Sequence, residues 1–175
     1  MNKKQNSFSA NKAGVVFSCL IVAIFIGLCF YKTDSLIIRD RFTHEVKLAR
    51  VLSKDSYIGI IYTHSVMKTE TSEWYRTDKG KLILMEQRYH SQGAGLPSTT
   101  DYKFKYENNI FTLYDINKPF DEITYRTGAV IANHRLSIAG KEKPFLSFSD
   151  PREALSFKVE QTSIIKLLIW RCMYG

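Results

Sequence analysis

The longest apolar stretch of the chain lies near its start, at residues 13–31, and contains no charged side chain. Lys3, Lys4 and Lys12 precede it, with no acidic residue among them. At about 1.5 Å per residue, the stretch would form a helix of roughly 28 Å, close to the thickness of the hydrocarbon core of a bilayer. The pattern predicts one transmembrane helix over residues 13–31.

A cleaved signal peptide would need small residues directly after the apolar stretch. Leu28, Cys29, Phe30 and Tyr31 stand there instead, so an uncleaved anchor is expected. Since positive residues favour the cytoplasmic side, residues 1–12 are expected to form a cytoplasmic tail and residues 32–175 a single extracytoplasmic domain. Small residues about one helical turn apart would give the anchor a close-packing face. They are Gly14, Ser18, Ala23 and Gly27.

The rest of the chain alternates with a period of two, which is typical of β-strands. Residues 57–64 place Ile58, Ile60, Tyr62 and His64 on one face, and residues 82–87, 102–106 and 155–160 alternate in the same way. Turn residues at 78–80, 107–109 and 139–144 separate these stretches. The pattern predicts a mainly β fold, an antiparallel β-sandwich or small barrel.

The two ends of the domain are less regular. Apolar residues at 36–38 and 46–51 predict a first hairpin near the membrane surface. Residues 163–173 are apolar but too short to span a bilayer. They predict a terminal strand or helix packed on the domain, or else a segment that lies in the membrane interface or docks on a membrane partner.

Charge and cysteine content exclude two classes of protein. The net charge is +8, but the basic residues of the domain are interleaved with acids, so a solvated surface beside an anionic membrane is expected and a nucleic-acid partner is not. Only Cys172 lies outside the apolar stretch, so the domain cannot close an internal disulfide.

Two stretches carry candidate chemistry. The first is His64 and Ser65, followed by Glu73; the second is the loop Gly93, Ala94, Gly95, Leu96 and Pro97. A glycine-rich loop can form a turn or present N–H groups to an anion. With His90 and His134, the first stretch has the residue types of a zinc site, but no metal-ligand spacing, so no metal is expected. His64 and Ser65 would point to opposite faces of a strand, and neither an enzyme activity nor a cofactor is expected.

These stretches, with a later Asn-His-Arg-Leu at residues 133–136, resemble the family named domain of unknown function 1850, over roughly residues 35–160. The resemblance implies small membrane-anchored extracytoplasmic proteins of the bacterial inner membrane that accompany TRAP transporters of the TAXI type. The resemblance implies that the residues of these stretches belong to the family pattern, and that Val66 and His134 belong to it as well.

The resemblance favours a non-catalytic accessory subunit beside the transporter permease, which helps to dock the extracytoplasmic binding protein. Two alternatives stay open. The domain could itself bind a small anion or carboxylate between the Gly93–Pro97 loop, His64 and His134, or it could be an envelope structural protein unrelated to transport.

Overall fold

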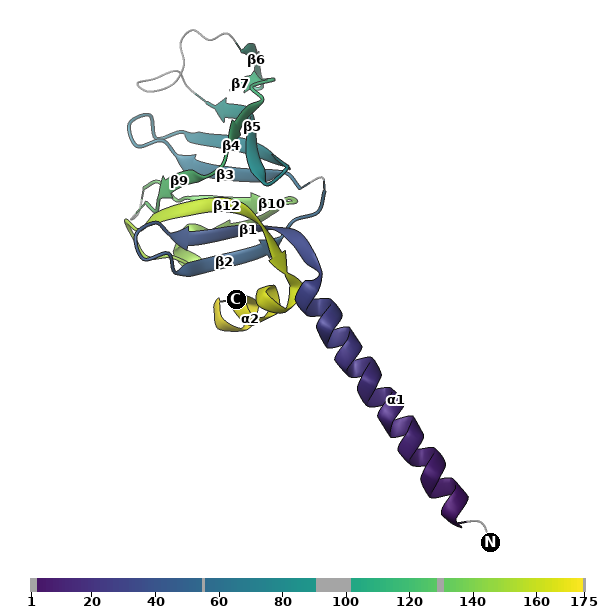
Figure 1. Cartoon of the computed structure of the whole chain (residues 1–175). Coiled ribbons are helices and arrows are strands. Elements are labelled where there is room, and N and C mark those ends of the chain that lie inside the picture. Colours follow the sequence, from purple (N-terminus) through teal and green to yellow (C-terminus); the bar gives the residue numbers. More distant parts are fainter. Residues whose placement is uncertain (1–2, 55, 91–101, 129–130, 175) are drawn as a thin grey trace.

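The computed structural model describes residues 3–54, 56–90, 102–128 and 131–174, with backbone alone for 3–13 and 174. A long helix, α1 (Lys3–Phe30), leads into a β-rich domain, and a short helix, α2 (Ile164–Tyr174), follows the last strand (Figure 1). Among the described residues, no helix is both long enough and apolar enough to cross a membrane. The structure confirms a helix over the apolar stretch. That this helix crosses a bilayer stays a prediction.

The strands form two open antiparallel sheets. The first has the order β2-β1-β12-β9 and the second β11-β10-β3-β4-β5-β7-β6, with β8 also paired to β5. The strands are β1 (Lys32–Asp40), β2 (Val46–Val51), β3 (Ile58–Thr63), β4 (Glu70–Asp78), β5 (Lys81–Tyr89), β6 (Lys103–Glu107), β7 (Ile110–Tyr114), β8 (Lys118–Phe120), β9 (Ile123–Arg126), β10 (Arg135–Ile138), β11 (Lys141–Pro144) and β12 (Ala154–Ser163). The mainly β prediction is confirmed, but the described strands close no barrel.

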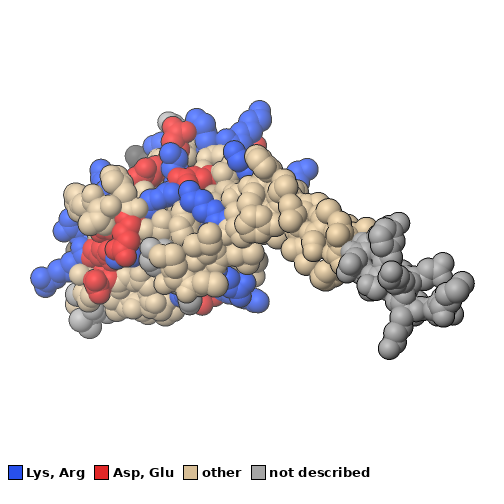
Figure 2. Space-filling model, turned by 60° about the horizontal axis from the view of Figure 1, so that its bottom comes forward, with Lys and Arg blue, Asp and Glu red and all other residues tan. Residues whose placement is uncertain are grey.

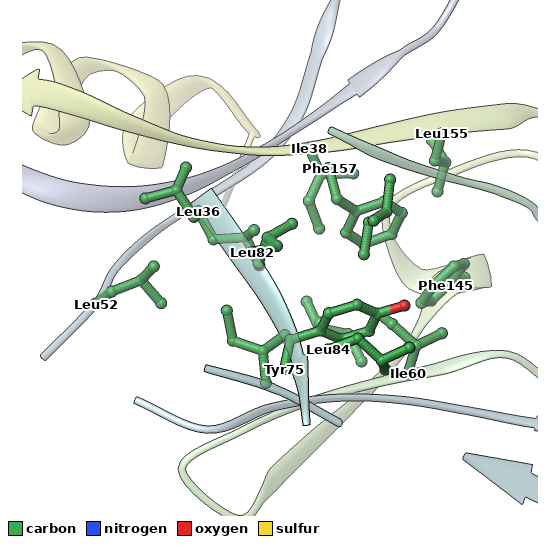
Figure 3. Packing of buried hydrophobic residues seen from close by; sticks show 14 of the residues in the cluster. Leu36, Ile38, Leu52, Ile60, Tyr75, Leu82, Leu84, Phe145, Leu155 and Phe157 are labelled. Atoms are coloured by element: carbon green, nitrogen blue, oxygen red, sulfur yellow. The ribbon is translucent and has the colours of Figure 1, made fainter. Parts of the chain in front are cut away.

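The main core lies between the two sheets (Figure 3). Leu36 and Ile38 enter it from β1, Ile60 from β3, Leu82 from β5 and Phe157 from β12, and all five side chains are fully buried. Burial of each such side chain contributes about 1.5–3 kcal/mol. The period-two pattern therefore reflects one core-facing side of each strand.

β1 is buried on both faces. Ile37, between Leu36 and Ile38, points to the opposite side of the sheet and packs with Val46 and with Leu167 of α2. α2 thus covers the outer face of the four-stranded sheet, and the ring of Trp170 lies 6.0 Å from the Arg39 guanidinium. The predicted first hairpin is confirmed as β1 and β2, and of the alternatives for residues 163–173 the structure has a helix packed on the domain.

Three two-residue turns join neighbouring strands, and both residues of each turn have positive φ. Lys79-Gly80 joins β4 to β5, Asn108-Asn109 joins β6 to β7, and Ala139-Gly140 joins β10 to β11. This conformation matches the right-handed twist of paired strands, and glycine and asparagine adopt it at low cost. The prediction of a loop through residue 144 is wrong, because residues 141–144 pair with β10 as an edge strand.

Candidate functional site

Glu73 lies at the centre of a hydrogen-bonded polar cluster between the two sheets. It stands on β4, two residues before Tyr75, so both side chains point to the same face of the strand. The Tyr75 hydroxyl donates to Glu73 Oε2 at 2.7 Å, and Gln87 Nε2 of β5 donates to Glu73 Oε1 at 3.2 Å. The carboxylate is thus held from within its own sheet.

The opposite sheet supplies a second tyrosine. The hydroxyl of Tyr125, on β9, also donates to Glu73 Oε2, and it lies 2.8 Å from the Tyr75 hydroxyl. Each phenol carries one proton. Two protons are therefore shared among three close contacts, those of the two hydroxyls with Glu73 and with each other. Glu73 therefore links the two sheets through charge-assisted hydrogen bonds, which are stronger than neutral ones.

Burial and the nearby carboxylate both act on the tyrosines around Glu73. Burial, and then the negative charge of Glu73, raise the pKa of Tyr75 and of Tyr125 far above the usual range. The same two causes raise the pKa of Tyr62 to about 12. All three phenols therefore stay protonated in the physiological range and can act only as neutral donors or acceptors.

A cavity of about 490 Å³ opens beside this network. Its wall carries two carboxylates, Glu73 and Glu122, and one lysine, Lys118, among aromatic and aliphatic side chains. The remaining lining residues are Tyr75, Leu84, Gln87, Tyr102, Ile116, Phe120, Ile123, Thr124 and Tyr125. We call this cavity the Glu73 pocket. Its excess of carboxylate over ammonium and its aromatic rings suit a ligand with positive charge or hydrogen-bond donors.

His134 contacts Tyr62. Its ring stacks between Tyr62, at 5.4 Å, and Phe145, at 5.3 Å, and Nδ1 accepts a hydrogen bond from the Gly128 N–H at 3.1 Å. Burial lowers the pKa of His134 below its ordinary value. A neutral ring that accepts at Nδ1 carries its proton on Nε2, so this histidine acts here as the acceptor that fixes the Gly128 N–H.

His64 and His90 are engaged by the backbone around them. His64 and Ser65 were predicted to lie in the strand. This prediction is wrong, because both lie in the turn that follows β3. His64 Nδ1 accepts from the N–H groups of Val66 and Met67, both at 3.3 Å, which closes this turn. His90 Nδ1 lies 3.0 Å from the carbonyl oxygen of Glu70.

The predicted site residues are thus only partly brought together. Glu73 and His134 both approach Tyr62, whereas His64 stabilises its own turn. The loop Gly93, Ala94, Gly95, Leu96 and Pro97 lies outside the described residues. Within the described part of the chain, no three His, Cys, Asp or Glu side chains gather closely enough to hold a metal ion.

Sequence reasoning missed Tyr75, Gln87 and Tyr125. The position of Tyr75, two residues after Glu73, is a period-two signal that could have been read from the sequence. Gln87 pairs with Glu73 because a register shift between Trp74 and Tyr75 moves this part of β5 by one residue from the pairing that the turn at Lys79-Gly80 begins. Such a shift cannot be read from the sequence pattern. Tyr125 belongs to the other sheet, and no local pattern points to it.

The family model of the domain of unknown function (DUF1850) matches residues 58–145, half of the chain. The chain belongs to this family. The match begins at β3 and ends at Phe145, so it contains Glu73, Tyr125 and His134. The expected likeness over residues 35–160 is wider than the matched region, which leaves out β1, β2 and β12. No curated protein and no solved structure matches the chain.

Proposed function

We propose that this DUF1850 protein is a non-catalytic accessory subunit of a TAXI-type TRAP transporter, held in the bacterial inner membrane by residues 13–31. In this arrangement residues 1–12 are cytoplasmic and the β-domain is extracytoplasmic. The permease contacts the helix, and the domain supports the extracytoplasmic binding protein. The family resemblance implies these partners, and three features of the molecule support the arrangement.

The observation that carries the proposal is the exposed apolar surface of α1. Val15, Phe17, Ile24 and Phe25 of α1 are each more than half exposed, and they point in different directions around the helix. A helix that is apolar all round is stable only when lipid or other helices cover it. A membrane and a permease together supply both kinds of cover.

The joint between helix and domain is the second supporting feature. α1 ends at Phe30 and β1 begins at Lys32, with the N–H of Tyr31 bonded to the Gly27 carbonyl at 2.8 Å. The N–H of Ile164, the first residue of α2, donates to the Tyr31 carbonyl at 3.2 Å. Because no linker separates them, a partner that binds α1 also fixes the position of the domain, and even weak contacts gain from the high local concentration.

The third feature is the hairpin of β6 and β7, which lies at the end of the domain far from α1 (Figure 1). Its strand β6 exposes Phe104 and Tyr106, which stack on Phe111. Exposed aromatic residues are enriched at protein interfaces. This hairpin is therefore the surface that we assign to the binding protein.

The proposal is tested by mild solubilisation of native membranes and capture of the protein through a tag at its N-terminus. We expect a TRAP permease to be recovered in stoichiometric amount and identified by mass spectrometry. A Phe104→Ser variant should retain the permease and lose the binding protein. Recovery of the protein without any permease would contradict the proposal.

The Glu73 pocket favours a second function, which is capture of a small molecule by the domain itself. Its carboxylates predict preference for a cation, in contrast to the anion expected from the sequence. Calorimetry of the full chain in detergent with putrescine and with succinate, which have equally short carbon chains and opposite charge, separates the two. Heat of binding with putrescine alone supports the pocket as a cation site, and no heat with either compound contradicts this second function.

A further inference from the structure

Three elements meet where α1 joins the domain. Val51, at the end of β2, pairs with Ser35, close to the first residue of β1. α2 begins beside Tyr31 and packs against β2 (Figure 1). The end of β2 and the face of α2 therefore lie beside the emerging helix.

A cleft of about 430 Å³ lies between β2 and α2. Two guanidinium groups, those of Arg50 and Arg171, line it together with apolar side chains. The apolar lining residues are Ala49, Val51, Ile164, Leu167 and Leu168. Val51 is 54% exposed and Leu168 is 47% exposed. The cleft is thus amphipathic, with positive charge and open apolar walls.

The positive charges in this cleft have no acidic partner among the described ion pairs. Burial and then the charge of Arg171 lower the pKa of Arg50, and burial and then Arg50 lower the pKa of Lys143. The neighbouring acid Glu142 is engaged by Arg135, at 2.8 Å. The repulsion between these cations is relieved when an anion binds among them.

We propose that this Arg50–Arg171 cleft binds the phosphate group of an anionic phospholipid. The two guanidinium groups take the phosphate oxygens, for which their planar donor geometry is suited. The acyl chains lie along Val51 and Leu168 toward α1. The inference rests on the membrane location proposed above and is independent of the permease.

The apolar walls identify a lipid and not a free phosphate ion. Figure 2, with the lower end of the molecule turned forward, shows an uncharged surface that runs from the domain onto α1 with Lys and Arg side chains beside it. A soluble phosphate would gain nothing from exposed apolar walls, whereas an acyl chain buries them. α2 then lies along the lipid surface with its basic residues at the level of the headgroups.

Native mass spectrometry of the full chain in detergent tests this assignment by titration with phosphatidylglycerol, phosphatidylcholine and inorganic phosphate. We expect phosphatidylglycerol to bind about tenfold more tightly than phosphatidylcholine, and Arg50→Gln and Arg171→Gln each to weaken it about tenfold. The matched control is Arg126→Gln. Arg126 is exposed and pairs with Ala154, at the end of β12 opposite to α2, so this variant should bind as the unchanged protein does.

Three results would overturn the inference: equal retention of the two lipids, unchanged binding by Arg171→Gln, or displacement of phosphatidylglycerol by inorganic phosphate. The Arg171 side chain is exposed, so its replacement leaves the packing intact even where Arg50→Gln disturbs the fold. The assay contains no transporter. Failure of lipid selectivity and failure of permease recovery are therefore separate outcomes.

Discussion

At the scale of single residues, Glu73 joins the two sheets through phenolic donors on both of them. A charged acceptor between sheets is costly unless its hydrogen bonds are made. Tyr75 and Gln87 make these bonds from one sheet, and Tyr125 makes one from the other. The network therefore specifies how the sheets face each other, in addition to the apolar core.

Replacement of Tyr125 by Phe removes its donation to Glu73 and keeps the aromatic packing against Phe157. We expect the free energy of unfolding to fall by about 1.5–3 kcal/mol, the contribution of a hydrogen bond to a charged group. Urea unfolding monitored by fluorescence measures this change. Tyr106→Phe is the control, because the Tyr106 hydroxyl bonds Asn109 on an exposed hairpin. Equal shifts of the unfolding midpoint in both variants would contradict the role given to Glu73.

His134 makes the stability of the domain depend on pH. Burial lowers its pKa in the folded protein below the ordinary 6.5. The unfolded chain therefore takes up a proton more readily as the pH falls through 6.5, and the free energy of unfolding decreases until the folded pKa is also passed. Protonation also removes the acceptor for the Gly128 N–H.

We expect the urea midpoint to fall between pH 8 and pH 5.5, and His134→Gln to reduce this dependence while lowering stability at pH 8. His44→Gln, in an exposed turn, should keep the slope of the unchanged protein. A His134→Gln variant with the original slope would assign the pH dependence to other groups.

At the scale of elements, the strands follow from local patterns in different degrees. β3, β5 and β12 are confirmed where the sequence alternates, and the turns at Lys79-Gly80 and Asn108-Asn109 are confirmed where residues tolerate positive φ. No alternating stretch was identified for β4, β7, β9 or β10. The same holds for β8 and β11. β8 and β11 are short edge strands that pair with free backbone groups of β5 and β10. Those groups are available only once the sheet has formed, so no local pattern predicts these strands.

Leu167 is the buried side chain of α2 in its contact with the domain. Leu167 is 7% exposed and packs on Ile37 and Val46, whereas its neighbour Leu168 is 47% exposed. Leu167→Ala should weaken this contact by about 2–4 kcal/mol and release α2, because it leaves a cavity under the helix. Hydrogen exchange of the α2 amides measures the release. Leu168→Ala is the matched control and should leave exchange unchanged, and equal exchange in both variants would show that Leu167 does not dock the helix.

At the scale of the whole molecule, α1 is the part that meets the transporter in the proposed assembly. At about 100° per residue, Ala23 and Gly27 lie on one side of the helix, and Gly14 and Ser18 lie nearly on the opposite side. Ala23 and Gly27 form the face that would allow close approach of a permease helix. At Gly27 an added Cβ would meet no atom within 4 Å. A larger side chain there can therefore disturb a partner without disturbing the domain.

Gly27→Leu should lower permease recovery several-fold at unchanged domain stability, as measured by capture and thermal unfolding of the same preparations. Val22→Leu is the control. Val22 lies about 140° around the helix from Gly27, and its replacement should leave recovery unchanged. Full recovery with Gly27→Leu would exclude this face as the contact.

The sequence alone determined the helix over residues 13–31, the main strands, two of the turns and the family. The helix, strands and turns depend on hydrophobic periodicity and on backbone preferences within a few residues, which a single sequence displays directly. The family was indicated by the resemblance of its motif residues. Glu73 and His134 could be singled out as well, through the family pattern and as residue types that could surround His64.

Only the tertiary structure decided which of these residues meet. Tyr125 reaches Glu73 from the other sheet, and Arg171 of α2 reaches Arg50 of β2. Such contacts depend on how the two sheets face each other and on where α2 packs, which are set by the burial of the whole core and not by any local pattern. The sequence had suggested one site for His64 and His134, but the structure engages His64 in its own turn and stacks His134 between Tyr62 and Phe145.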